Sequence, residues 1–367
     1  MAIYDSATME RLPLIDARRI AIIKPSALGD VVQALPLLPA LRRRFPTSHI
    51  TWVVQRELAD LVTGHPDLDA VIRCDRRPTW TQIGTLAREL AQARFDLVFD
   101  LQGLLRSALM TWATRARYRI GLETAREGAH LSTTHTIPNT PRAMPAHARY
   151  WRVAEALGVG DTPRRVLIEV PLTAHAAAKK WLAGLPRPLI AVQWGAKWET
   201  KRWPVAGFAD VLSRAAHTWG GTAVLVGAKA DRPASEEMTR QIQQRVPGAA
   251  VLDLTGRTTI KELAAVVTQV DAMFSNDSGP LHLAAELGTP SLGVFTCTSA
   301  VRSGPPGTAH EFVAAEVPCA ASYCKTCPNS GDLHLACHRV LQAERVWRGL
   351  QRLIEKHALA ETCRRAA

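Results

Sequence analysis

The segment RIAIIKPSALGDVV, residues 19–32, decides the fold class. Its β-branched run over 19–24 is followed by a turn that contains Gly29, and an apolar segment continues over 31–44. This order predicts a strand, a glycine turn and a crossover helix, which is typical of a parallel sheet. The rest of the first half is predicted to hold strands at 49–54, 70–72, 95–100 and 118–121, a helix over 104–116 and a loop region over 126–147.

The second half repeats this architecture without a recognisable sequence repeat. Strands are predicted at 188–193, 222–227, 250–254, 271–275 and 291–295, and helices at 205–218, 233–245, 259–268 and 280–287. The fold class is therefore predicted to be α/β, with two doubly wound, Rossmann-like domains facing each other across a cleft. Proline-containing stretches place the boundary near 165–187. Ligands of this fold class bind at the carboxyl ends of the strands.

Composition narrows the function classes. The 367 residues carry 45 Lys and Arg against 33 Asp and Glu, a formal net charge of +12 that is spread evenly along the chain. An even spread argues against a nucleic-acid-binding stripe and is compatible with anionic substrates or an anionic membrane surface. The hydrophobic content of 47% excludes a disordered chain. No apolar run is long enough to span a membrane, and the start lacks signal-peptide features, so we expect a cytoplasmic protein.

Three polar turns follow predicted strands and are candidates for chemistry. KPSALGDV (24–31) places Asp30 at a helix start, where it is either a general base or only a helix cap. QWGAKWETKRWP (193–204) brings Lys197 and Lys201 to a helix start, as a diphosphate site or as an ordinary charged loop. SNDSGPLHLAA (275–285) combines Asp277 with a glycine turn and a helix that begins near Pro280.

Taken together, these three segments resemble glycosyltransferase family 9, the family of the ADP-heptose:lipopolysaccharide heptosyltransferases. The resemblance extends over roughly 19–340 and includes ALPLLPALR (34–42), TKRWP (200–204) and NDSGPLHLAAELGTP (276–290). In addition, FDLVFDLQGLLRSA (95–108) and ETARE (123–127) are similar to heptosyltransferase I.

The resemblance implies a GT-B fold and an inverting transfer that requires no cofactor. It implies an acceptor-binding domain over 1–172, a nucleotide-sugar-binding domain over 173–345, and a C-terminal helix and tail over 346–367. Asp30 would be the general base, and Lys201 would stabilise the diphosphate leaving group. The implied donor-binding residues are Lys197, Asp231, Asp277, Ser278, Gly279 and His282. The implied acceptor-binding residues are Ser26, Gly29, Gln102, Arg106, Arg117, Arg119 and Arg126, although each arginine has an alternative as ordinary surface.

A cysteine-rich segment, CAASYCKTCPNSGDLHLACH (319–338), departs from the type I resemblance. Such segments are found in relatives that resemble type II. Its four thiols, Cys319, Cys324, Cys327 and Cys337, either bind a structural zinc or iron or are reduced packing groups. The seven cysteines of the chain are odd in number and clustered, which argues against a disulfide framework. Trp194, Trp198 and Trp203 crowd the second turn, where they stack on an adenine or pack in the core.

The sequence thus predicts transfer of a heptose from ADP-heptose to an inner-core lipopolysaccharide acceptor (Kdo-lipid A). The enzyme would work as a peripheral protein at the cytoplasmic face of the inner membrane. The alternatives are a same-family transferase with another sugar donor or a protein acceptor, a GT-B sugar-nucleotide epimerase, and a non-catalytic binding module. The intact Asp30, Lys201 and Asp277 argue against the last.

Overall fold

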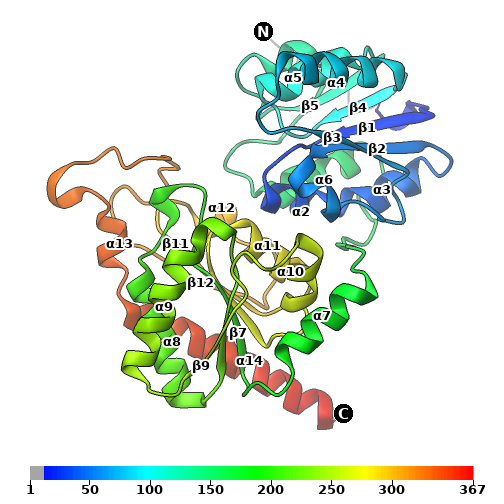
Figure 1. Cartoon of the computed structure of the whole chain (residues 1–367). Coiled ribbons are helices and arrows are strands. Elements are labelled where there is room, and N and C mark those ends of the chain that lie inside the picture. The colour runs from blue at the N-terminus through cyan, green and yellow to red at the C-terminus, as the bar shows by residue number, and fades with distance from the viewer. Residues whose placement is uncertain (1–11, 367) are drawn as a thin grey trace. The chain divides into compact units, whose positions relative to one another are not determined.

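Two six-stranded sheets, parallel throughout, organise the chain, as the computed structural model shows (Figure 1). The structure describes the backbone of residues 12–366 and the side chains of residues 12–357, so the first eleven residues and the Cys363 side chain lie outside it. The chain divides into two compact units between Glu169 and Val170. The division comes three residues before the expected end of the first domain. Each unit is described by itself below.

Unit 1 has the strand order β3-β2-β1-β4-β5-β6. Its central strand β1 is buried at four of its five positions, which explains why residues 20–23 are all apolar, because a parallel strand is covered on both faces. The strands are β1 (Arg19–Ile23), β2 (His49–Gln55), β3 (Ala70–Cys74), β4 (Leu97–Asp100), β5 (Tyr118–Leu122) and β6 (His135–Ile137).

The helices of unit 1 form two groups, and Figure 1 shows α4 and α5 side by side on one face of the sheet, with α2, α3 and α6 on the other. The α-helices are α2 (Leu28–Ala34), α3 (Leu37–Arg44), α4 (Trp80–Gln92), α5 (Leu105–Ala113) and α6 (Ala146–Ala156). Short 3₁₀ helices are η1 (Leu12–Leu14), η2 (Arg56–Leu61) and η3 (Ala129–Ser132).

Unit 2 has the order β12-β11-β10-β7-β8-β9, which is the same winding pattern. Its strands are β7 (Leu189–Gln193), β8 (Thr222–Leu225), β9 (Ala250–Asp253), β10 (Ala272–Asn276), β11 (Ser291–Phe295) and β12 (Glu311–Ala314). Its α-helices are α7 (Leu172–Leu182), α8 (Val205–Trp219), α9 (Arg232–Arg245), α10 (Ile260–Val267), α11 (Gly279–Glu286), α12 (Ala300–Ser303), α13 (Ala336–Val340) and α14 (Ala343–Ala366). Its 3₁₀ helices are η4 (Glu199–Lys201), η5 (Lys229–Asp231) and η6 (Gly331–Leu333).

Local sequence signals explain where several elements begin. Thr259 caps α10: its hydroxyl accepts the Glu262 N–H at 3.2 Å, and the Glu262 carboxylate accepts the Thr259 N–H at 2.8 Å. This reciprocal pair satisfies two backbone donors at the helix start. The core of unit 2 includes an aromatic series in which the rings of Trp203 and Phe208 lie 5.2 Å apart and those of Phe208 and Phe274 4.5 Å apart.

The fold confirms the predicted α/β class and corrects several details. Region 126–147, predicted as a loop, contains η3 and β6 and ends in the first turn of α6. Helix α4 and strand β12 were not predicted. The C-terminal helix α14 starts at Ala343 and packs on α8 and β12, so it is part of unit 2. None of the helices described is long and apolar enough to cross a membrane.

Candidate active site

Each sheet reverses its winding direction between two central strands, and polar side chains gather at both of these switch points. In unit 1 the reversal lies between β1 and β4, and in unit 2 between β7 and β10. Such a switch point leaves room at the carboxyl ends of the strands, because the connections leave in opposite directions. The residues predicted from the three polar turns lie at these two points.

In unit 1 the Asp30 carboxylate is held by groups from several elements. Asp30 stands on the first turn of α2, where its Oδ2 accepts the Ala27 N–H at 3.3 Å. The Tyr150 hydroxyl, from α6, donates to Asp30 Oδ1 at 3.1 Å. The Lys24 ammonium lies 3.8 Å from Oδ2. The Asp30 side chain keeps 39% of its exposure, so a ligand can reach it.

Lys24 is almost completely buried at the end of β1. Burial lowers the pKa of its ammonium, although the carboxylates of Asp30 and Asp100 oppose this. The ammonium donates to Gln102 Oε1 at 3.4 Å and lies 5.0 Å from the centroid of the Tyr150 ring. Burial and the charge of Asp30 raise the pKa of Tyr150 well above its ordinary value, so its hydroxyl remains a donor.

The turn after β4 places Gln102 beside this group. Asp100 accepts the N–H groups of Gln102 and Gly103, both at 2.9 Å, and the Ser107 hydroxyl at 2.9 Å. Burial raises the pKa of Asp100 in spite of these hydrogen bonds. Gln102 Oε1 also accepts the Ser26 N–H at 3.4 Å. The structure thus brings Ser26, Gly29 and Gln102 together with Asp30.

The four arginines predicted to bind the acceptor do not join this group. The Arg106 guanidinium donates to the carbonyls of Asp75 and Arg76, and that of Arg119 donates to the carbonyls of Ser132 and Ala116. Both side chains line a separate cavity of unit 1. Arg117 lies over the Tyr118 ring at 5.2 Å, and Arg126 is exposed in the turn before η3.

In unit 2 a buried ion pair joins the second and third turns. Lys201 Nζ lies 2.7 Å from Asp277 Oδ2, and the Thr298 hydroxyl donates to the same oxygen at 2.7 Å. His282, from the first turn of α11, brings its Nε2 to 3.7 Å from Asp277 Oδ1. Lys201 also lies 4.9 Å from the centroid of the Trp198 ring. The Asp277 carboxylate therefore orients the lysine and the histidine.

Electrostatics keep Asp277 ionised. Burial by itself would raise its pKa, but the hydrogen bond from His282 and the charge of Lys201 outweigh burial and hold the pKa far below its usual range. Lys201 itself remains 19% exposed, so its charge can meet an anion. The arrangement presents a fixed cation at the carboxyl end of β7.

The start of α11 adds backbone donors beside this cation. Ser278 is the N-cap, Gly279 is the first helical residue, and Pro280 follows it. The Ser278 hydroxyl shares a hydrogen bond of 3.0 Å with the Ser275 hydroxyl. His282 Nδ1 is buried and has no hydrogen-bond partner among the residues that the structure describes. The first N–H groups of a helix and its dipole together suit a phosphate.

Asp231 lies close to two glycines that follow β7 and β8. A Cβ atom on Gly195 would lie 3.3 Å from both Asp231 carboxylate oxygens, and one on Gly227 would lie 3.1 Å from Oδ2. Asp231 accepts the Ala228 N–H at 2.9 Å. The absence of a side chain at these two glycines therefore leaves room for the Asp231 carboxylate. Lys197 is exposed on the loop after β7.

The cysteine-rich segment packs against the loop that carries Lys201. The Thr200 hydroxyl donates to the Cys324 carbonyl at 2.7 Å, and the His338 ring lies 3.3 Å from the Thr200 carbonyl. Cys337 is buried in the core, and burial, with the neighbouring thiols, raises its pKa to about 11. The six cysteines described are free thiols.

Within residues 12–357, no three His, Cys, Asp or Glu side chains are arranged to hold a metal ion. The four thiols predicted as ligands therefore do not form a tetrahedral site in this arrangement. Instead, the Cys319 sulfur accepts from Asn329 at 3.5 Å, and the Cys327 sulfur accepts the Leu335 N–H at 3.3 Å. Metal binding stays a prediction that elemental analysis of the purified protein would test.

Sequence reasoning missed several residues of these groups. Lys24 carried a signal in the composition, since it is the sole lysine among the first 170 residues. Tyr150 and Thr298 had none, because each reaches its carboxylate from a distant element. Two of the three tryptophans of the second turn, Trp194 and Trp203, are core residues of unit 2.

Comparison with known proteins identifies the class. Residues 83–332 match the family model of glycosyltransferase family 9 (heptosyltransferase). A lipopolysaccharide core heptosyltransferase of Haemophilus influenzae is 24% identical over 295 residues, covering 78% of this chain and 82% of the relative. Lipopolysaccharide heptosyltransferase 1 of Pseudomonas aeruginosa is 27% identical over 330 residues, covering 84% and 87%.

Solved structures agree on the fold. A family 9 glycosyl transferase from Veillonella parvula superposes with a TM-score of 0.77 at 24% identity, covering 92% of this chain and 98% of that one. An ADP-heptose lipopolysaccharide heptosyltransferase II of E. coli superposes with 0.72 at 21%, covering 93% and 99%. The fold is that of the GT-B glycosyltransferases. The chain belongs to glycosyltransferase family 9, the heptosyltransferases, and is a glycosyltransferase.

Proposed function

We propose that this enzyme transfers a heptose from ADP-heptose to an anionic, inner-core lipopolysaccharide acceptor (Kdo-lipid A). The observation that carries the proposal is the Lys201–Asp277 pair at the start of α11, where a cation and free helix N–H groups adjoin. This combination suits the diphosphate of a nucleotide-sugar. The relatives named above are lipopolysaccharide heptosyltransferases, which supports a heptose as the transferred group.

The reaction is a single displacement with inversion. Asp30 takes the proton from the acceptor hydroxyl, and the hydroxyl oxygen forms a bond to the anomeric carbon of the donor sugar. The bond from that carbon to the diphosphate oxygen breaks, and ADP leaves with the electron pair. Lys201, together with the N–H groups at Ser278 and Gly279, stabilises the charge that develops on the leaving group.

The remaining residues have supporting roles in this proposal. Asp277 positions Lys201, since its oxygens are engaged by Lys201, Thr298 and His282. Asp231 accepts hydroxyls of the ribose, and Lys197 contributes positive charge beside the phosphates. On unit 1, Gln102 and Ser26 position the acceptor near Asp30, and Arg117 and Arg126 supply positive charge toward its anionic groups. Arg106 and Arg119 have no part in this proposal, because their guanidinium groups donate to backbone carbonyls at the separate cavity. The enzyme would work as a peripheral protein at the membrane face where its acceptor is made.

Asp30→Asn tests the general base. The substitution keeps the size and one acceptor oxygen but removes the proton-accepting charge, so we expect turnover to fall by about 10²–10⁴-fold. Binding of ADP-heptose, measured by calorimetry, should stay within about twofold. The matched control Asp161→Asn removes an exposed carboxylate that pairs with Arg43, and it should not change turnover. Normal turnover in Asp30→Asn would remove Asp30 from the reaction.

A donor and acceptor screen tests the substrate assignment. The purified enzyme is incubated with ADP-, GDP- and UDP-sugars, each with Kdo-lipid A, and the masses of the products are measured by mass spectrometry. We expect a mass gain of one heptose with ADP-heptose only. Transfer to a protein, or epimerisation of the donor without an acceptor, would replace this proposal by the corresponding alternative.

A further inference from the structure

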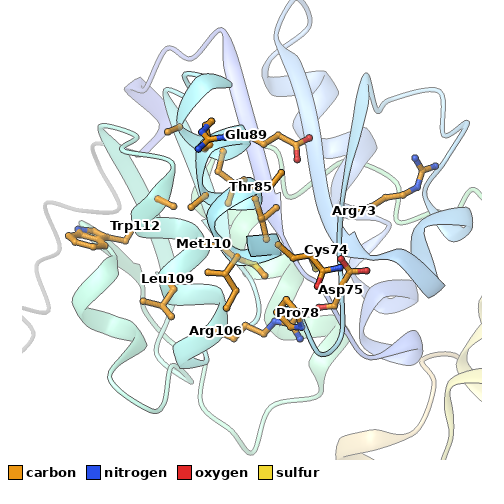
Figure 2. A pocket seen from close by; sticks show the side chains of 18 of the residues that line it. Arg73, Cys74, Asp75, Pro78, Thr85, Glu89, Arg106, Leu109, Met110 and Trp112 are labelled. Atoms are coloured by element: carbon orange, nitrogen blue, oxygen red, sulfur yellow. Dashed lines mark hydrogen bonds between the residues drawn. The ribbon is translucent and has the colours of Figure 1, made fainter. Parts of the chain in front are cut away.

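A large cavity lies in unit 1, between helices α4 and α5 and the end of β3. Its volume is about 1250 Å³, which exceeds the range of about 300–1,000 Å³ that small-molecule pockets occupy. Figure 2 shows Leu109 and Trp112 on one side, Arg73 and Asp75 on the other, and Met110 and Thr85 between them. Asp30 and Lys24 are not among its lining residues.

Apolar side chains along one stripe of helix α4 line this cavity. Ile83, Leu86 and Leu90 recur at helical spacing and line it, yet Leu90 is the one fully buried residue of the helix, and Ile83 keeps 41% exposure. An apolar stripe of a surface helix normally packs on a core. Leu90 and Leu86 pack on the core of unit 1, whereas Ile83 remains exposed, so part of the stripe is left uncovered at the cavity.

Helix α5 contributes the facing apolar wall. Leu109 and Trp112 are 56% and 68% exposed, whereas Met110 forms a buried part of the lining. Large side chains that are exposed next to one another mark surfaces that bind a partner or a membrane. The two helices together therefore form an apolar groove rather than scattered surface residues.

Arginines surround this groove. Seven arginines line it, against the two acids Asp75 and Glu89. Arg56 pairs with Asp75, and Arg106 and Arg119 donate to backbone carbonyls. Four others, all exposed, form no ion pair within residues 12–357: Arg73, Arg76, Arg88 and Arg115. Their charge is available for phosphate groups, which arginine binds with paired N–H donors.

We propose that the groove between α4 and α5 takes an acyl chain of an anionic membrane phospholipid, with the lipid phosphate held by the surrounding arginines. An apolar groove with a cationic rim fits an amphiphile. A soluble anionic sugar would not need the groove, and an uncharged apolar peptide would not need the arginines. Such binding would hold the enzyme at the membrane location proposed above, and lipid binding can be measured without turnover.

Flotation with vesicles tests the charge requirement. Vesicles of phosphatidylcholine with phosphatidylglycerol should bind the wild-type protein at least about tenfold more tightly than phosphatidylcholine alone, since each basic residue near an anionic surface contributes attraction. The triple variant Arg73→Gln, Arg88→Gln, Arg115→Gln should lose on the order of 100-fold in affinity. As matched controls, Arg142→Gln and Arg165→Gln should bind like the wild type. Binding only to vesicles that contain the lipopolysaccharide acceptor would overturn the assignment to phospholipid.

Brominated acyl chains test occupation of the groove. They should quench tryptophan emission on binding, and Trp112→Phe should lose part of that quenching while vesicle binding remains.

Two substitutions in the groove test whether it holds the acyl chain. Ala113→Trp fills the groove without adding charge, and Leu109→Asp places a charge in it. Both should weaken binding of the mono-acyl lipid lysophosphatidylglycerol at least tenfold, with an unchanged circular dichroism spectrum. Val301→Asp, at an exposed apolar residue of unit 2, is the matched control.

Two results would overturn the proposal. If Leu109→Asp and Ala113→Trp bind anionic vesicles and the mono-acyl lipid like the wild type, electrostatic attraction to the membrane surface alone explains the binding. If sedimentation equilibrium shows a dimer that Leu109→Asp dissociates, and no lipid binds, the groove belongs to a second copy of the chain. Turnover on a deacylated, soluble acceptor should be equal in all variants, which separates this test from that of the transfer reaction.

Discussion

At the scale of single residues, both polar clusters use a carboxylate to hold a lysine, but the two lysines differ in burial. Lys201 keeps access to solvent while its partner Asp277 is buried, whereas Lys24 is buried and its partner Asp30 is exposed. The accessible member of each pair, Lys201 in unit 2 and Asp30 in unit 1, is the one to which a reacting role is assigned above. The buried member fixes its position.

Removing the buried carboxylate should cost both stability and activity. Asp277→Asn leaves the Lys201 charge without its partner, and breaking such a pair costs about 3 kcal/mol of unfolding free energy. Lys201→Met should lower kcat strongly. The double variant should lose less unfolding free energy than the sum of the two single losses, by about 1 kcal/mol or more, because neither charge is then left without its partner. Lys180→Met, an exposed lysine on α7, is the control in urea unfolding and turnover assays. Additive effects on stability would contradict the coupling.

His310 should make stability depend on pH. Burial, with the neighbouring charges of His357 and Lys356, lowers its pKa to about 4, below the ordinary 6.5 of the unfolded chain. Between these values the unfolded state binds a proton that the folded state does not, so stability falls as the pH falls from about 6.5 to 4. Urea unfolding of His310→Gln should show a shallower loss over this interval. The exposed His217→Gln should follow the wild type, and identical curves for all three proteins would contradict the assignment.

At the scale of elements, the sequence predicted most strands of both sheets within one or two residues, since buried parallel strands are short and β-branched. It missed α4, which contains the weak helix former Gly84, although Thr79 and Gln82 form a capping pair at its start. It missed β6 because His135 and Thr136 carry little apolar signal. The Asp30, Lys201 and Asp277 turns were predictable because each follows a buried strand. The partners Tyr150 and Thr298 were not, since tertiary packing alone brings them there.

Helix α4 should be stabilised by a single methyl group. A Cβ on Gly84 would meet no atom within 4 Å, and alanine is favoured over glycine in a helix interior by about 1 kcal/mol. Gly84→Ala should therefore slow hydrogen exchange of the α4 amides about fivefold. By contrast, a Cβ on Gly207 of α8 would lie 2.5 Å from the Trp203 ring, so Gly207→Ala should lower the unfolding free energy. Unchanged exchange in Gly84→Ala would show that packing rather than propensity limits α4.

At the scale of the whole molecule, two units of the same strand order are joined by an irregular segment. Residues 163–170 belong to no helix or strand and are largely exposed. Within it, Arg164 is tied down, because its guanidinium donates to the His147 carbonyl at 3.0 Å and lies over the Trp151 ring. Arg165 is exposed. Contacts of Arg164 thus anchor the segment, whereas the neighbouring Arg165 is accessible to solvent.

Limited trypsin digestion should cut first after Arg165. Exposed segments without secondary structure between compact units are preferred cleavage sites. Intact mass measurement should then find two fragments that meet at Arg165 and Val166. Arg165→Gln should slow this cut, whereas Arg164→Gln should leave it in place. A first cut in the cysteine-rich segment, at Lys325, would contradict the prediction.

The lysine at the end of β1 has a practical consequence. It is the only lysine of the first 170 residues, it is 2% exposed, and burial lowers the pKa of its amine. A larger fraction of that amine is therefore neutral and nucleophilic than in a surface lysine. An acylating reagent built on an acceptor sugar would find one side-chain amine in that half of the chain. Covalent labelling of Lys24, detected by peptide mapping, would show whether an acceptor lies beside Asp30.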